Sequence, residues 1–99
     1  MTVEWPSATV VAADRRIVFC DLDNERVLLD LASSRYYALN KVGAHVWEVI
    51  ANPTSVGKLH ESLLEKFEVE PERCQQDLEA LLSNLAQLTL IDVQHAPLD

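Results

Sequence analysis

The sequence contains few cysteines, few glycines and no long apolar segment. Two of its 99 residues are cysteine and two are glycine. Cys20 and Cys74 form no close pair and no metal-ligand spacing, which argues against a disulfide framework or a zinc knuckle. Gly43 and Gly57 stand apart, whereas a phosphate-binding loop needs clustered glycines. No apolar run approaches the roughly 20 residues of a membrane-spanning helix. We therefore expect no membrane partner and no bound metal or cofactor.

Basic residues are also scarce. Eight lysines and arginines stand against sixteen aspartates and glutamates, which gives a formal net charge of -8. This balance argues against a nucleic-acid partner, because a phosphate backbone attracts basic surfaces. Residues 1–6 lack the basic and apolar segments of a secretion signal, so we expect a cytoplasmic protein.

The first half of the chain has the patterns of strands. Residues 16–22, 26–31 and 35–39 are rich in β-branched, aromatic and aliphatic residues. Turn-forming residues follow the first run at 23–24 and the second at 32–34. Because both faces of 26–31 are largely apolar, we expect this run to be the middle strand. Such short connections predict an antiparallel meander.

The second half has the patterns of three helices. Asn40 is a predicted N-cap, and Asn52-Pro53 ends the helix that follows. Thr54 is the predicted N-cap of a second amphipathic helix. Pro71 suits the first position of a third helix, which carries leucines at helical spacing from Leu78 onward. The prediction is an α+β, winged-helix-like fold, a three-stranded antiparallel sheet followed by three helices. We divide the chain into an N-terminal arm (1–15), one domain (16–93) and a tail (94–99).

Residues suited to catalysis are scattered rather than grouped. His45, His60 and His95 lie far apart in the sequence, and none is part of a metal-ligand motif. A nucleophilic cysteine needs a base and an open, electropositive setting. Cys74 instead lies on an apolar helical stripe, and Cys20 lies within a predicted strand. We therefore expect no enzyme, with a small cysteine hydrolase as an alternative.

The third predicted strand points instead to binding. Tyr36 and Tyr37 must point to opposite faces of the sheet, because side chains alternate along a strand. A three-stranded meander also has two open edges, each a template for another strand. An edge beside a leucine-rich helix would form a peptide-binding cleft, in which backbone bonds give affinity and side-chain pockets give selectivity.

Several segments, in this order and spacing, resemble the family of pyrroloquinoline quinone biosynthesis protein D, PqqD. They are 27–31 (Val-Leu-Leu-Asp-Leu), 35–40 (Arg-Tyr-Tyr-Ala-Leu-Asn), 42–44 (Val-Gly-Ala), Trp47-Glu48, the leucine pattern after Asp77, and Leu90-Ile91. The resemblance extends over roughly residues 15–92. The family commonly has glycine before the last apolar pair, where this chain has Thr89.

The resemblance implies a non-catalytic recognition element for ribosomally made, post-translationally modified peptides. In such elements the leader segment of a precursor peptide adds as a strand between the third strand and the third helix. Carried onto this sequence, the leader-binding residues would be Arg35, Tyr36, Tyr37, Ala38 and Leu39 on the strand, and Arg73, Cys74, Asp77, Leu81 and Asn84 on the helix.

Within this family the chain looks closer to the free-standing leader-binding proteins of lasso-peptide pathways, the N-terminal part of a split B protein. That likeness implies two further partners, a separate transglutaminase-like cysteine protease that removes the leader and a cyclase. One alternative is a PqqD-type chaperone that presents a precursor peptide to a radical SAM enzyme. A second alternative is a winged-helix regulator that binds DNA, which the acidic third helix disfavours.

Overall fold

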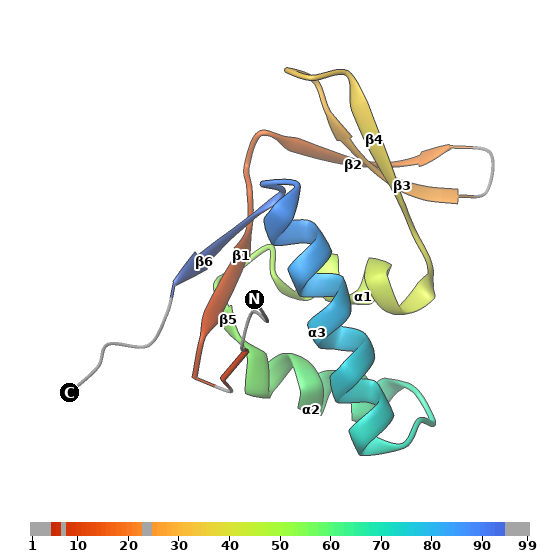
Figure 1. Ribbon diagram of the computed structural model, residues 1–99. Coiled ribbons are helices and arrows are strands. Elements are labelled where there is room, and N and C mark those ends of the chain that lie inside the picture. The colour runs from red at the N-terminus through yellow and green to blue at the C-terminus, as the bar shows by residue number, and fades with distance from the viewer. Residues whose placement is uncertain (1–4, 7, 23–24, 95–99) are drawn as a thin grey trace.

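The computed structural model describes residues 5–6, 8–22 and 25–94. It contains three helices and two three-stranded sheets within principal extents of 40 × 32 × 26 Å. Figure 1 shows the third helix crossing the middle of the molecule, with one sheet beyond its C-terminal end and the other at its side. The turn predicted at 23–24 and residues 95–99 of the predicted tail lie outside the described residues.

The first sheet is the predicted meander. Strands β2 (Ile17–Leu22), β3 (Glu25–Asp30) and β4 (Arg35–Leu39) pair antiparallel in the order β2-β3-β4. The prediction that the second run is the middle strand is confirmed. Leu28 lies opposite Tyr37 on the face that packs against the core, and Leu28 is 1% exposed. Tyr36 lies on the other face and is 69% exposed, so the two tyrosines point to opposite faces as predicted.

The helices follow in the predicted order. Helix α1 (Lys41–Val49) begins after Asn40, whose side chain accepts a hydrogen bond from the Gly43 N–H at 2.8 Å. Helix α3 (Pro71–Gln87) has Pro71 at its first position, where the missing N–H costs no helical hydrogen bond. Both starts are confirmed.

The predicted cap of the second helix is wrong by one residue. Helix α2 (Val56–Lys66) is capped by Ser55, whose hydroxyl accepts from the Lys58 N–H at 3.2 Å. The hydroxyl of Thr54 donates instead to the Asn52 carbonyl at 2.8 Å, and Thr54 pairs with Val11 in a strand. Thr54 therefore cannot cap the helix, because its backbone and side chain are both engaged elsewhere.

The second sheet was not predicted as a sheet. It has the order β5-β1-β6, in which β1 (Val10–Ala13) pairs antiparallel with β5 (Thr54–Ser55) and with β6 (Ile91–Gln94). Trp5 and Val11 of the predicted arm are buried in the core. Strand pairing therefore ties Val10–Ala13 to the rest of the domain, and apolar packing does the same for Trp5.

The core lies where the helices meet both sheets. Its fully buried side chains come from every helix and include Val46 and Ile50 near α1, Leu59 and Leu63 of α2, and Leu78, Leu82 and Leu85 of α3. Among the described residues, no helix is long and apolar enough to cross a membrane. The α+β class, with an antiparallel meander followed by three helices, is confirmed.

Candidate functional site

Strand β4 is an edge strand. It pairs with β3 on one side, and no described strand pairs with its other side. In an antiparallel ladder, alternate residues direct their N–H and C=O groups away from the neighbouring strand. Every second residue of β4 therefore offers a backbone donor and acceptor at the free edge, which is the arrangement that accepts an added strand.

A cavity of about 330 Å³ lies between the beginning of β4 and the end of α3. We call it the β4/α3 cavity. Its lining residues come from β3, the turn before β4, β4 itself and the end of α3: Leu28, Asp30, Ser33, Arg35, Tyr36, Tyr37, Gln87, Leu88, Thr89 and Leu90. Leu88 is 42% exposed, so an apolar side chain already faces solvent beside the free edge. The cavity can take a side chain of a strand that pairs with β4.

The end of α3 gives the cavity its shape. The Leu90 N–H bonds to the Leu85 carbonyl at 2.9 Å, and the Thr89 N–H bonds to the Ala86 carbonyl at 3.0 Å. These two bonds define a Schellman motif, with Thr89 in the left-handed conformation at a φ of 58°. The chain therefore turns sharply at Thr89. Leu88 stays partly exposed on one side of this turn, while Leu90 enters the core.

The predicted strand residues divide between two cavities. Arg35, Tyr36 and Tyr37 line the β4/α3 cavity. Leu39, at the other end of the strand, is 9% exposed and lines a separate cavity beside α1. Ala38 is exposed and lines neither cavity.

The predicted helix residues share one side of α3 but lie outside the β4/α3 cavity. Arg73, Asp77 and Asn84 are exposed, and Leu81 is half-buried. At 100° per residue these four positions fall within one quarter of the helix circumference, and Leu88 continues the same stripe. They form a continuous surface that leads to the cavity from the helix N-terminus.

Cys74 belongs to the core rather than to this surface. It is 6% exposed, and its burial raises the pKa of the thiol above its ordinary value, with a further contribution from the Asp77 carboxylate. A buried, protonated thiol is a poor nucleophile. The described residues also contain no group of three or more His, Cys, Asp and Glu side chains placed to hold a metal ion.

The residues at the end of α3 were missed by sequence reasoning. Gln87, Leu88 and Thr89 line the β4/α3 cavity, although the helical pattern marked Leu88 only as one more core leucine. One signal was present: the resemblance described above implies glycine at the position of Thr89, and glycine is the residue typical of a left-handed helix end. That position marks the turn that exposes Leu88.

Comparisons with solved structures show the same fold in three proteins. "TbiB1 in Complex with the TbiA(beta) Leader Peptide" is 23% identical with a TM-score of 0.72, covering 87% of this chain and 99% of that one. "Lasso peptide synthetase B1 complexed with the leader peptide" is 24% identical with a TM-score of 0.71, covering 83% and 96%. The PqqD truncation of Methylobacterium extorquens PqqCD, described as a stand-alone RiPP recognition element, is 19% identical with a TM-score of 0.73, covering 90% and 95%.

Comparison by sequence gives the family. No curated protein matches this chain significantly. The model of the family described as "Coenzyme PQQ synthesis protein D (PqqD)" matches residues 25–91, which run from β3 to the first residue of β6. This match takes in β4, α3 and the cavity between them. The chain belongs to the PqqD family.

Proposed function

We propose that this protein is a non-catalytic recognition element that binds the leader segment of a precursor peptide by strand addition at the free edge of β4. The observation that carries the proposal is the position of that edge beside the β4/α3 cavity. Backbone bonds to β4 would hold the peptide, and the cavity would select one of its side chains. Support also comes from the family and from two proteins of the same fold whose structures contain leader peptides.

The sheet favours one direction for the added strand. Both existing strand pairs are antiparallel. Antiparallel pairing is slightly more stable per residue than parallel pairing, so we expect the peptide to run antiparallel to β4. Its C-terminal part would then pass Arg35 and the β4/α3 cavity, and its N-terminal part would pass Leu39.

Backbone hydrogen bonds alone are too weak to account for micromolar binding of the leader. A micromolar complex corresponds to about -8.2 kcal/mol. Each hydrogen bond contributes only about 0.5 to 1.5 kcal/mol net, and part of that gain is offset by ordering the peptide. Apolar side chains of the leader must therefore be buried as well. Leu28, Tyr37 and Leu88 around the cavity provide the apolar surface for this contact.

The exposed stripe of α3 would extend this contact along the helix. Arg73, Asp77, Leu81 and Asn84 lie on the side of α3 that leads to Leu88. We propose that they form the wall opposite β4, and that Cys74 supports this wall from the core. The leader would then contact β4 on one side and this stripe of α3 on the other, along the whole paired segment.

The likeness to a lasso peptide synthetase B1 supports a proposal for the pathway partners. We propose that the bound leader is presented to a separate transglutaminase-like cysteine protease and then to a cyclase. Among the described residues, Cys74 is buried, and we propose that this protein supplies no catalytic group of its own for such a reaction.

A second candidate keeps the same binding mode but changes the partner. The family model carries the name of a coenzyme PQQ synthesis protein, and the PqqD truncation has the same fold. A radical SAM enzyme would then receive the peptide in place of a leader protease. Pull-down of each purified enzyme by the peptide-loaded protein distinguishes the two candidates.

The test is binding of labelled leader peptides encoded beside this gene, measured by fluorescence anisotropy. The matching core peptides and a DNA duplex at low salt are the controls. We expect saturable binding of one leader and no binding of its core or of DNA. A folded protein, checked by circular dichroism, that binds no leader would contradict the proposal. Binding of DNA alone would favour the regulator instead.

A further inference from the structure

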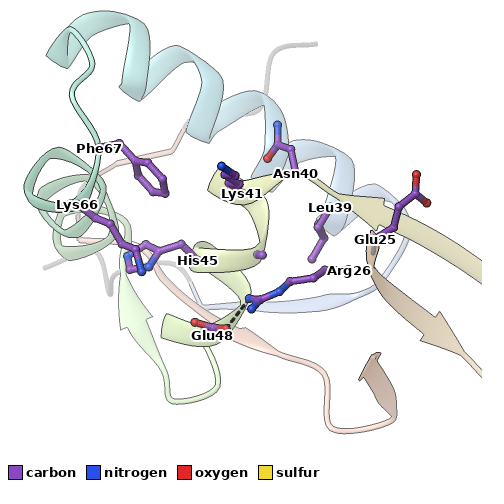
Figure 2. A pocket seen from close by; sticks show the side chains of 10 residues that line it. Glu25, Arg26, Leu39, Asn40, Lys41, His45, Glu48, Lys66 and Phe67 are labelled. Atoms are coloured by element: carbon purple, nitrogen blue, oxygen red, sulfur yellow. Dashed lines mark hydrogen bonds and ion pairs between the residues drawn. The ribbon is translucent and has the colours of Figure 1, made fainter. Parts of the chain in front are cut away.

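A second and larger cavity lies at the other end of β4. Its volume is about 600 Å³, and its walls come from α1, the beginning of β3 and the end of α2. We call it the α1 cavity. Figure 2 shows Lys66 and Phe67 on one side of it and Glu25 on the opposite side, with the Arg26–Glu48 ion pair between them. Leu39, the last residue of β4, also lines it, so the proposed peptide-binding strand ends at this cavity.

Basic side chains outnumber acidic ones in the lining of this cavity, although the chain as a whole is acidic. The chain has eight lysines and arginines and a net charge of -8. Three of the eight, Arg26, Lys41 and Lys66, line the α1 cavity. The Arg26 charge is already satisfied, because its Nη1 lies 2.8 Å from Glu48 Oε1 and its Nε lies 3.6 Å from Asp21 Oδ1. Lys41 and Lys66 therefore supply the available positive charge, against one further carboxylate of the lining, Glu25.

Lys41 and Lys66 carry no ion pair within the part of the chain that the structure describes. Lys41 is also the first residue of α1, so its backbone lies at the positive end of the helix dipole. Both side chains are exposed, and they can reorient toward a ligand. An anionic group near them would meet two cations and a favourable helix end.

The floor of the cavity is apolar and fixed. Ala44 is 3% exposed, and Phe67 is half-buried against the core. The His45 ring meets the Phe67 ring edge-on with centroids 5.9 Å apart, and its Nε2 lies 2.8 Å from Ser62 Oγ. These contacts hold the aromatic floor in place. The cavity thus combines a packed apolar base with two exposed lysines at its rim.

We infer that the α1 cavity binds an acidic side chain of the same precursor peptide, located in the segment that precedes the residues paired with β4. This inference rests on the proposed function. In an antiparallel arrangement, the N-terminal flank of the peptide passes Leu39 and reaches Lys41. A carboxylate there pairs with Lys41 and Lys66, and the methylene groups of the same side chain lie against Leu39 and Phe67.

The test compares two versions of the cognate leader in anisotropy titrations. One version contains the N-terminal flank, and the other begins at the paired segment. The variants are Lys41→Gln, Lys66→Gln and the double variant, with Lys58→Gln as the matched control. Lys58 is an exposed lysine of α2 that does not line the cavity.

We expect the double variant to bind the long peptide roughly tenfold more weakly than the parent protein does at low salt. The double variant is needed because each exposed ion pair contributes little by itself. Its affinity for the short peptide, and the affinities of Lys58→Gln for both peptides, should equal those of the parent. The difference should shrink at about 0.5 M salt, where exposed charges are screened. Replacing the acidic residue of the long peptide by its amide should abolish the effect of the double variant.

The outcomes separate this inference from the function on which it rests. If the parent binds both peptides and the double variant binds the long one equally well, the α1 cavity is not a peptide site, although leader binding stands. A cognate leader with no acidic residue in that flank overturns the inference in the same way. If the parent binds neither peptide, both proposals fail together.

Discussion

The indole Nε1 of Trp5 donates a hydrogen bond of 2.8 Å to the hydroxyl oxygen of Ser83, joining the N-terminal arm to the third helix. Trp5 is 5% exposed, so this contact is largely shielded from water. The bond connects residues 78 positions apart. It holds the first described residue of the chain against the helix that forms one wall of the candidate site.

Removing the Trp5 side chain should destabilise the whole domain. We expect Trp5→Ala to lower the free energy of unfolding by about 3 to 5 kcal/mol, because truncating a buried aromatic leaves a cavity in the core. Ser83→Ala should cost about 1 to 3 kcal/mol, since it leaves the buried indole N–H unpaired. Urea denaturation measures both values.

Ser33→Ala is the control, because Ser33 is exposed in the turn before β4 and makes no such contact. A Trp5→Ala protein with the stability of the parent would mean that the arm does not pack on the domain in solution. A Trp5→Phe, Ser83→Ala double-mutant cycle gives the contribution of the hydrogen bond alone.

Thr89 holds a backbone conformation that suits glycine better. Its φ is 58°, a region in which a side chain costs about 1 to 2 kcal/mol. We expect Thr89→Gly to raise the stability by about 0.5 to 1 kcal/mol, after allowing for the greater freedom of glycine in the unfolded chain. For a domain of this size the melting temperature should rise by about 4 °C, as measured by calorimetry.

Thr89→Ala is the informative comparison, because alanine keeps a Cβ in the same left-handed position. If the glycine variant is no more stable than the alanine variant, strain at this helix end is not significant. A parent protein more stable than the alanine variant would instead point to the hydrogen bond from Thr89 Oγ1 to the Leu88 carbonyl, at 2.6 Å.

Local structure was predictable wherever short sequence patterns decide it. The strand at 35–39 and the helix beginning at Pro71 were predicted with the bounds that the structure gives. The second sheet was not predictable in this way, because β5 has two residues and β1 has four. Too few residues alternate in them to show a period, and their pairing joins segments far apart in the sequence.

The candidate site was predictable from the strand side only. Edge position follows from the order of three consecutive strands, so β4 could be identified from the sequence. The cavity depends instead on where α3 stops relative to β4. That stop is set by the left-handed conformation of Thr89, which propensity does not favour for a β-branched residue. Periodicity therefore indicated the apolar side of α3 without showing that Leu88 is exposed.

Acid titration should reveal the turn between β1 and β2. Arg16 donates hydrogen bonds to Asp14 from its side chain, at 2.9 and 3.2 Å, and from its backbone N–H at 2.8 Å. The side-chain bonds, and then the backbone bond, lower the pKa of Asp14 from 3.8 to about 2. We expect an NMR titration of the carboxyl carbon to give this value, and Arg16→Gln to move it back toward 3.8.

The sign of the effect on stability follows from this lowered pKa. The ionised form of Asp14 is favoured in the folded state. Its contribution to the free energy of unfolding is therefore present above about pH 4 and is lost as the pH falls through about 2. The contribution is small because the Arg16 side chain is 80% exposed to solvent, although that of Asp14 is only 13% exposed. A midpoint near 3.8 in the parent protein would contradict the ion pair.

The two cysteines should differ in reactivity. Cys20 is half-buried, whereas Cys74 is 6% exposed and has a raised pKa because it is buried. Since only the thiolate reacts, we expect a maleimide at pH 7 to modify Cys20 first and Cys74 only when urea is added. Mass spectrometry after digestion assigns the modified residue, and Cys20→Ser should abolish the fast phase. Faster reaction at Cys74 would reopen the hydrolase alternative.

Leu88 should be the most sensitive helix residue for leader binding. It lines the β4/α3 cavity and is 42% exposed in the free protein. Full burial of a leucine contributes about 1.5 to 3 kcal/mol, so placing a charge there should weaken leader binding about tenfold or more. Anisotropy titrations of Leu88→Glu with the cognate leader measure this loss.

Val18→Glu is the matched control, because Val18 is 41% exposed but lies on β2, with β3 between it and the free edge. Its leader affinity should equal that of the parent, and circular dichroism should show both variants folded. Asp77→Lys and Leu81→Gln then test how far the leader-binding surface extends along α3 from the β4/α3 cavity. Weaker leader binding in these two variants would show that the surface extends toward the helix N-terminus. Unchanged binding in both, with a loss in Leu88→Glu, would limit the surface to the β4/α3 cavity.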